Sequence, residues 1–317
     1  MNQSSPGQFE HLIGLTVQTL AHAKLNLRLK ITGRRDDGFH LLSMINSEIS
    51  LADEIALTFD REPGVRLETV AAHADANFSD PARNLAARAA SSYLHELSTP
   101  LGVTIRLRKN VPVGSGLGGG SSDAAAVLRL LHTQVRAPNI SREKLNGIGL
   151  SLGADVPYFL QRGVCHVTGV GERVRMLSAR ALRGAPVFLF VPKTPIATPE
   201  LYALYRTRFP KLIAQDDAAA LATLGTEELS YHETVSLVEN DFESLLQEFA
   251  PAVWDEISLV RRVGGLRVGL TGSGSAFFAL SEQRTEPAPG ALGRLQDLVS
   301  STGTKVLALR LLAADQS

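Results

Sequence analysis

The spacing of apolar residues along the chain shows the two periods that are typical of strands and helices. Leu25, Leu27, Leu29 and Ile31 alternate with polar residues, which indicates a half-buried strand. Further strands are predicted over 48–59, 65–70, 103–108, 187–191 and 305–312, and a strand, a glycine turn and a strand over 266–280. Helices are predicted over 84–97 with Asn84 as the N-cap, from Ser121 or Ser122 onward, over 141–152, within 199–262 and over 292–300.

Both element types occur throughout the 317 residues without regular strand–helix–strand alternation, which favours an α+β fold. The length suits about two domains. The apolar pattern is weakest over 163–184, so this stretch is the candidate domain boundary. Thr32 to Gly38 is predicted to be a turn.

Charge and cysteine content exclude several classes of protein. Lysine plus arginine and aspartate plus glutamate both number 32, so nothing indicates binding to nucleic acid or an anionic membrane. The single cysteine, Cys165, rules out an intrachain disulfide and a zinc site of the CxxC kind. No apolar run reaches the roughly 18 residues that span a bilayer, and the N-terminus does not resemble a signal peptide. These features predict a cytoplasmic protein, and they leave its oligomeric state open.

The stretch "PVGSGLGGGSSDAA", residues 112–125, lies between a predicted strand and a predicted helix. Glycine is costly to order, so such a run indicates a backbone that must approach something closely. A loop leading into a helix presents unpaired N–H groups, and the helix start adds partial positive charge. The stretch is therefore a candidate phosphate cradle that needs no lysine.

Other interpretations of this stretch fit less well. A Walker A loop fails because no lysine follows the glycines. Gly114, Gly116 and Gly119 match the dinucleotide fingerprint formally, but that fingerprint belongs near the start of a parallel strand–helix–strand unit. A protein-kinase loop would need HRD and DFG motifs downstream, and neither is present. A flexible turn or tight helix–strand packing stays open on glycine content alone.

Several blocks together resemble one family. The glycine stretch is similar to the phosphate loop of the GHMP kinase superfamily. "AHAKLNLRLKITGRRDDGFHLLSMI" (21–45), "LGADVPYFLQRGVCHVTGVGE" (152–172), "NDFE" (240–243) and "LTGSGSAFFA" (270–279) resemble, in the right order, the 4-diphosphocytidyl-2-C-methyl-D-erythritol kinases of that superfamily. The rival interpretations are another GHMP-type small-molecule kinase and a non-catalytic nucleotide-binding protein. The "GRRDDGFH" segment favours the cytidine-recognising family.

The resemblance implies a two-domain GHMP kinase fold with the active site in the cleft between domains. Residues 1–170 would form an ATP-binding domain like domain 2 of ribosomal protein S5, with the strand 305–317 packing back on it. Residues 171–317 would form a ferredoxin-like, acceptor-binding domain. The implied reaction transfers the γ-phosphoryl group of ATP, with Mg²⁺, to the 2-hydroxyl of the cytidylated acceptor in the non-mevalonate route to isoprenoid precursors. No protein ligand of the metal is implied.

The resemblance also assigns residues. Asp155 matches the family's catalytic aspartate and is expected to act as general base, and Lys24 matches its partner lysine. Asn26, on the same strand face as Lys24, either binds the acceptor or fixes the lysine. The expected ATP-binding residues are Pro112, Val113, Gly114, Ser115, Gly116, Leu117, Gly118, Gly119, Gly120, Ser121 and Ser122.

Four further positions complete the expected site. His40 falls where the family recognises cytosine, and its two ring nitrogens suit a pyrimidine edge. Phe39 stands where the family commonly has tyrosine, so stacking would survive but a hydroxyl contact would not. Thr198 resembles a further acceptor contact, and Lys109 resembles a position near the nucleotide base, although an ordinary strand-end lysine explains it as well. Asp123 is explained by the dipole of the helix that it opens.

Overall fold

The computed structural model describes residues 9–71, 80–97, 101–210, 228–285 and 287–313. The described chain divides into two compact units. The first is built from residues within Met1–Ala23, Leu51–Val111 and Gly118–Gln161, and the second from residues within Lys24–Ser50, Pro112–Leu117 and Arg162–Ser317. The predicted division near residue 170 stays a prediction.

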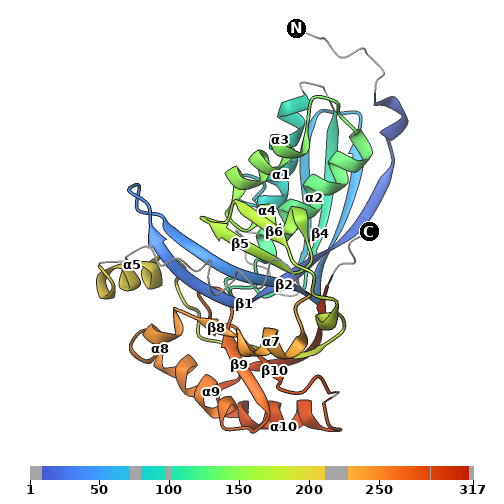
Figure 1. Ribbon diagram of the computed structural model, residues 1–317. Coiled ribbons are helices and arrows are strands. Elements are labelled where there is room, and N and C mark those ends of the chain that lie inside the picture. The colour runs from blue at the N-terminus through green and yellow to red at the C-terminus, as the bar shows by residue number, and fades with distance from the viewer. Residues whose placement is uncertain (1–8, 72–79, 98–100, 211–227, 286, 314–317) are drawn as a thin grey trace. The chain divides into compact units, whose positions relative to one another are not determined.

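The first unit is a sheet with helices on one face (Figure 1). Its strands are the first part of β1 (Thr16–Arg34), the last part of β2 (His40–Asp60), β3 (Gly64–Ala71) and β4 (Gly102–Lys109). β2 pairs antiparallel with β4, and β3 pairs parallel with β4 across the connecting helix α1. The helices are α1 (Leu85–Leu97), α2 (Gly119–Val135), α3 (Arg142–Leu152) and α4 (Val156–Gln161).

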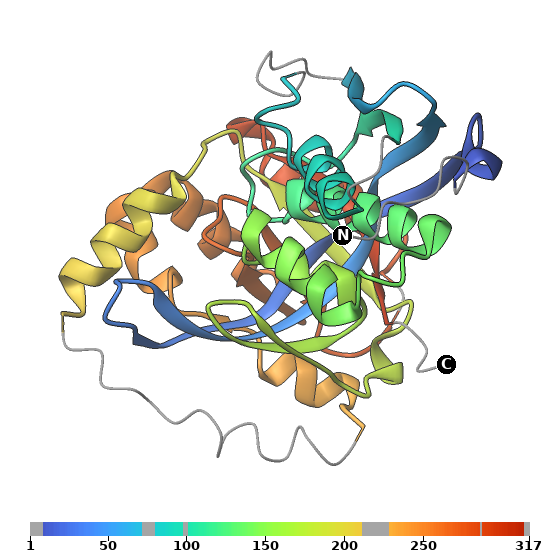
Figure 2. The same ribbon diagram turned by 90° about the horizontal axis from the view of Figure 1, so that it is seen from above.

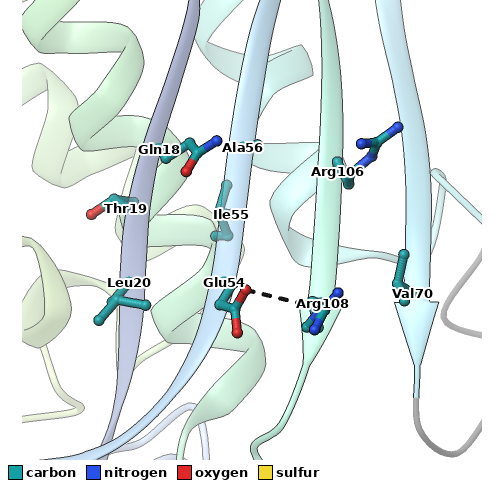
Figure 3. Close-up of a pocket in the computed structure, with 9 residues that line it drawn as sticks. All are labelled: Gln18, Thr19, Leu20, Glu54, Ile55, Ala56, Val70, Arg106 and Arg108. Atoms are coloured by element: carbon teal, nitrogen blue, oxygen red, sulfur yellow. Dashed lines mark ion pairs between the residues drawn. The ribbon is translucent and has the colours of Figure 1, made fainter.

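Period-two alternation gives this sheet two different faces. Ile55 and Leu57 of β2 and Ile105 and Leu107 of β4 are buried on the face that the helices cover. The opposite face is open and forms a shallow hollow of about 410 Å³, shown in Figure 3. Charged side chains cross this open face in pairs: Arg108–Glu54 at 3.9 Å and Arg106–Glu68 at 3.1 Å.

Helix starts in the first unit follow local sequence. The Asn84 side chain accepts a hydrogen bond from the N–H of Ala86 at 2.9 Å, which confirms it as the cap of α1. Ser141 caps α3 in the same way through the N–H of Lys144 at 3.2 Å. α2 begins at Gly119, earlier than predicted, because Gly118 takes a left-handed backbone conformation with φ of 70° and ends the loop there.

The second unit also combines a sheet with helices. Its strands are the remaining parts of β1 and β2 with β5 (Cys165–Gly169), β6 (Arg173–Met176), β7 (Pro186–Val191), β8 (Glu239–Asn240), β9 (Leu266–Leu270), β10 (Phe277–Ser281) and β11 (Lys305–Leu312). Its helices are α5 (Thr198–Arg208), α7 (Tyr231–Ser236), α8 (Glu243–Phe249), α9 (Pro251–Arg261) and α10 (Ala291–Leu298). β11, β7, β10 and β9 form an antiparallel run, and the rings of Phe190 and Phe277 stack at 4.6 Å between β7 and β10.

Several details differ from the sequence pattern. Thr32 to Arg34 continue β1 instead of turning, because β1 pairs with β2 and the N–H of Arg35 still donates to the carbonyl of Phe39 at 2.8 Å. The turn begins after Arg34. The weakly patterned stretch 163–184 contains the hairpin β5–β6, which pairs with β2 through Leu42↔Gly169 to Asn46↔Cys165. Part of the predicted helical stretch 199–262, residues 211–227, lies outside the described residues.

Tyr93 of α1 tests the packing of α1 on α2. Its ring is fully buried and lies 6.4 Å from that of His132 in an edge-on arrangement, and burial raises the pKa of the Tyr93 hydroxyl to about 12. Among the described residues this hydroxyl has no hydrogen-bond partner. An unpaired buried hydroxyl is unfavourable, so we expect Tyr93→Phe to raise the free energy of unfolding by about 1 kcal/mol in urea denaturation.

The control is Tyr93→Ala, which empties the ring's space and should lower the free energy of unfolding by about 3–5 kcal/mol. A loss of stability in Tyr93→Phe would contradict this account, because it would mean that the hydroxyl makes a stabilising bond.

Candidate active site

The glycine loop presents a row of backbone donors at the start of α2. Gly114, Gly116 and Gly118 have φ of 66°, 81° and 70°, a left-handed conformation that side chains disfavour. The N–H groups from Gly118 to Ser121 donate to no acceptor within the described parts of the chain. The first hydrogen bond of the helix runs from the N–H of Ser122 to the carbonyl of Gly118. Such orphan donors at a helix N-terminus suit an anionic ligand.

The side chains of the loop differ in how accessible they are. Val113 is 64% exposed, whereas Leu117 is buried. The Ser115 hydroxyl donates to the carbonyl of Pro112 at 2.8 Å, and the buried Ser122 hydroxyl donates to the carbonyl of His22 at 2.7 Å. Both hydroxyls therefore donate to backbone carbonyls of the protein and stabilise the conformation of the loop. Ser121 remains half-buried at the head of α2.

A second glycine turn, 271–274, packs directly on the first part of the loop. A Cβ on Gly116 would lie 2.3 Å from the carbonyl oxygen of Thr271, and one on Gly272 would lie 2.9 Å from the Cα of Gly116. The N–H of Ala276 donates to the carbonyl of Ser115 at 3.2 Å. Two backbones thus meet without side chains between them. This contact explains Gly272 as a close-approach residue.

Lys24 and Asn26 lie on one face of β1 and are both buried. The Lys24 amine donates to Asn26 Oδ1 at 2.5 Å, and the same oxygen accepts from the N–H of Gly272 at 2.7 Å. Asn26 Nδ2 donates to Asn46 Oδ1 at 2.7 Å. The backbone N–H of Lys24 donates to the carbonyl of Leu117, one residue before Gly118. Asn26 therefore orients the lysine and binds the glycine turn at once.

Asp155 lies at the start of α4, directly before Val156, and its carbonyl accepts from the N–H of Phe159. The side chain is half-buried. It follows Gly153, where an added Cβ would be 3.6 Å from the hydroxyl of Ser121. The head of α2 and the residues leading to Asp155 are therefore neighbours in the first unit. Lys24 belongs to the second unit, so its pairing with Asp155 stays a prediction.

His40 lies in an aromatic cluster in the second unit. Its ring is 5.1 Å from that of Tyr202 and 6.0 Å from that of Tyr205, both on α5, and Tyr202 also contacts Phe242 at 4.8 Å. α5 lies beside α8, which begins after Phe242 (Figures 1 and 2). Burial, aided by the positive charges of Arg34 and Arg206, lowers the pKa of His40 below its ordinary value of 6.5.

Two other residues of the predicted acceptor site, Phe39 and Thr198, differ in their surroundings. Phe39 is 64% exposed at the tip of the β1–β2 hairpin, so its ring is free of the core. The Thr198 hydroxyl is 2.6 Å from that of Ser273, which links the start of α5 to the second glycine turn. His40 Nε2 is buried and has no hydrogen-bond partner among the described residues. An aromatic cluster that contains one unpaired polar atom suits a flat heterocyclic ligand.

Comparison of the chain with known proteins gives the same family as the glycine loop and its neighbouring motifs. A family model described as "GHMP kinases N terminal domain" matches residues 84–163. A 4-diphosphocytidyl-2-C-methyl-D-erythritol kinase of Chlorobium phaeobacteroides (strain BS1) is 36% identical over 275 residues, 84% of this chain and 90% of the relative. The protein of the same name from Desulfitobacterium hafniense (strain Y51) is 35% identical and covers 85% of this chain and 89% of its own. The chain belongs to the 4-diphosphocytidyl-2-C-methyl-D-erythritol kinase family.

Solved structures extend the likeness to the fold. A crystal structure of a 4-(cytidine 5'-diphospho)-2C-methyl-D-erythritol kinase matches with a TM-score of 0.71 and 33% identity, covering 94% of this chain and all of the other. A homoserine kinase from Cytophaga hutchinsonii matches with a TM-score of 0.70 at 18% identity, which shows the fold alone. The predicted α+β fold of the GHMP kinases is confirmed, and the dinucleotide-binding fold is excluded.

Sequence reasoning missed three residues that contact residues of the predicted site. Tyr202 lies one helical turn after Thr198, and its ring faces that of His40. The four-residue spacing from Thr198 was the sequence signal that could have found it. Asn46 completes the amide chain from Asn26 but comes from a different strand. The carboxylate of Asp53 accepts a hydrogen bond from the Lys109 amine.

Within the described ranges, no helix is long and apolar enough to cross a membrane.

Gly116 offers a test of the packing between the two glycine turns. We expect Gly116→Ala to lower the free energy of unfolding by about 1–3 kcal/mol, because φ of 81° strains an alanine and its Cβ would overlap the Thr271 carbonyl. Urea denaturation measures the change.

The matched control is Gly147→Ala in α3, where an added Cβ meets nothing within 4 Å. There the gain in helix propensity should raise stability by about 0.5–1 kcal/mol. Equal stability of Gly116→Ala and the unchanged protein would show that the two backbones are not in close contact.

Proposed function

We propose that this protein transfers the γ-phosphoryl group of ATP to the 2-hydroxyl group of 4-diphosphocytidyl-2-C-methyl-D-erythritol. The product, the 2-phosphate, belongs to the non-mevalonate route to isoprenoid precursors. One observation carries the proposal. The chain shares more than a third of its aligned residues with relatives that bear this activity in their names, and the alignment covers about nine-tenths of each relative's length. We further infer a cytoplasmic location from the sequence.

ATP is assigned to the glycine loop. The orphan N–H groups from Gly118 to Ser121 would bind the oxygens of the terminal phosphates, with the partial positive charge of α2 behind them. The described residues contain no group of three His, Cys, Asp or Glu side chains that suits a metal ion. Mg²⁺, which neutralises phosphate charge, is assigned to the phosphate oxygens of ATP.

The chemistry needs a base and a fixed positive charge. Asp155 accepts the proton of the 2-hydroxyl group as its oxygen forms a bond to the γ-phosphorus, while the bond to the β–γ bridging oxygen breaks and ADP leaves. The Lys24 amine orients the hydroxyl group and supplies a positive charge beside the transferred phosphoryl group. Of the two roles open to Asn26, its contacts support that of fixing Lys24, since both polar atoms of its side chain already bind protein groups.

The cytosine ring is assigned to the cluster around His40. The exposed Phe39 ring offers a stacking surface, and Tyr202 supplies an aromatic wall beside His40. A neutral histidine can donate from one ring nitrogen and accept at the other. Thr198, linked to Ser273, lies at the start of the helix that carries Tyr202 and supplies a hydroxyl for the acceptor.

The activity is tested with the purified cytidylated acceptor and ATP, against homoserine and mevalonate as competing acceptors. We expect turnover of the cytidylated acceptor only. Loss of a general base costs about 10²–10⁴ in rate, so Asp155→Asn should lower kcat by at least about a hundredfold with KM for ATP little changed.

The control for that substitution is Asp255→Asn, which changes an exposed aspartate on α9. It should leave kcat unchanged. Full turnover by Asp155→Asn would remove this residue as the base. Equal turnover of homoserine or mevalonate would assign a different acceptor.

The lowered pKa of His40 gives a pH dependence. His40 is neutral at pH 7, because burial and the nearby arginines disfavour its protonated form. Because the pKa of His40 lies below the ordinary value of 6.5, protonation, which removes the accepting ring nitrogen, takes place on the acid side of that value. We expect KM for the cytidylated acceptor to rise on this acid side while KM for ATP stays flat, measured by initial rates from pH 5 to 8. His40→Gln should abolish the acid-side rise, and a rise that persists in it would assign the titration to another group.

A further inference from the structure

Three charged side chains are buried together at the base of the glycine loop. Asp53, Lys109 and Asp123 have relative exposures of 0%, 8% and 2%. Buried charges are costly unless they are paired and hydrogen-bonded, so this group calls for an explanation. We call these three residues the charge clamp.

The register of the sheet brings two members of the clamp together. Glu54 of β2 pairs with Arg108 of β4, so the antiparallel register sets Asp53 opposite Lys109 at the end of this strand pair. Both residues fall on the same face as Ile55 and Leu107, which the helices cover. A cross-strand ion pair therefore sits at the edge of an apolar face.

Asp53 holds the residues that lead into the loop. Its Oδ1 accepts from the N–H of Asn110 at 2.6 Å and from the N–H of Val111 at 2.8 Å. Its Oδ2 accepts from the Lys109 amine. One carboxylate thus fixes the backbone immediately before Pro112, where the glycine-rich stretch begins.

Lys109 holds the other end of the loop. Its amine donates to Oδ2 of Asp123 at 2.7 Å. Asp123 is the fifth residue of α2, beyond the first turn, so the helix dipole does not explain it. A Cβ added to Gly119 would lie 3.4 Å from the same amine. The ammonium group therefore lies against the head of the helix whose N–H groups are unpaired.

We propose that Asp53, Lys109 and Asp123 are positioning residues that hold the two ends of the glycine loop at a fixed separation, so that the α2 N–H groups face the ATP phosphates. The proposal rests on the proposed use of ATP at this loop. The clamp acts through the backbone, and Lys109 is engaged by the two carboxylates rather than directed at the nucleotide. Between its ends the loop has three glycines in the left-handed region, which supply little rigidity of their own.

The members of the clamp differ in what their loss should do. Burial raises the pKa of the Asp123 carboxyl well above its usual range, against the opposing effect of Lys109. Its Oδ1 also has no hydrogen-bond partner among the described residues. A neutral amide at position 123 still accepts from the lysine. Removing Lys109 instead leaves two buried carboxylates without a counter-charge.

The experiment compares Lys109→Met, Asp123→Asn and the double variant by ATP titration in a calorimeter and by initial rates with both substrates. Lys109→Met should weaken ATP binding by about tenfold or more, a loss of the size that one buried ion pair supports. KM for the cytidylated acceptor should change by less than about twofold in all three. Asp123→Asn alone should bind ATP within about threefold of the unchanged protein.

The double variant separates positioning from simple neutralisation of charge. Lys109→Met should lower Tm, because it leaves two buried carboxylates without a counter-charge. Asp123→Asn in that background removes one of the two carboxylates, so it should recover part of this loss of Tm. It should not recover ATP affinity, because the bridge between the loop ends is still absent. Recovery of both would overturn the clamp, as would wild-type ATP affinity in folded Lys109→Met.

Two controls complete the design. Thr304→Val breaks a buried hydrogen bond to Glu256 at 2.6 Å in the second unit, and it should lower Tm without altering ATP affinity. Amide hydrogen exchange over 112–122 should be faster in Lys109→Met than in Thr304→Val, and equal exchange in the two would count against the clamp. Failure of the proposed function would instead appear in the unchanged protein, as ATP binding without turnover of the cytidylated acceptor.

Discussion

The backbone N–H groups at the head of α2 have to be ordered and yet unpaired, and the local structure depends on meeting both conditions. A buried or half-buried N–H group without an acceptor is unfavourable, so a chain left to itself would rearrange to pair it. Three local features of the loop and its ends oppose the rearrangement. Gly118 fixes the helix start, the Thr271–Gly274 turn packs on Gly116, and the Asp53–Lys109–Asp123 cluster fixes the flanking backbone.

The same condition explains why glycine occurs where it does. At Gly116 a side chain would overlap a carbonyl oxygen of the neighbouring turn, and at Gly118 the positive φ is needed to redirect the chain into the helix. Glycine solves the steric problem but adds conformational entropy to the unfolded loop. The buried ion pairs and the backbone contacts with the second turn offset that cost. A loop rich in glycine, the most flexible residue in the unfolded chain, can therefore still take one conformation in the folded protein.

Sequence alone predicted the parts of this molecule that depend on local pattern. The alternation in β4, the Asn84 cap and the glycine loop before α2 follow from residues that are close in the chain. α4, β5 and β6 were not predicted, because they are short and, for β5, pairing with the distant strand β2 decides the conformation. Asp123 was attributed to a helix dipole because Asp53, the third member of its cluster, lies 70 positions earlier in the chain. Tyr202 was missed because its contact with His40 joins residues far apart in sequence.

Two buried lysines near the loop show how partner chemistry divides their roles. Lys109 is bound by two carboxylates, which raise its pKa even though burial alone would lower it. Its charge is thereby paired inside the first unit. The Lys24 amine is oriented by the amide oxygen of Asn26, which carries no net charge. An amide oxygen thus orients an ammonium group without placing a full negative charge beside it. A carboxylate at position 26 would form an ion pair with the lysine instead, but it could not donate to Asn46 Oδ1 as the Asn26 amide group does.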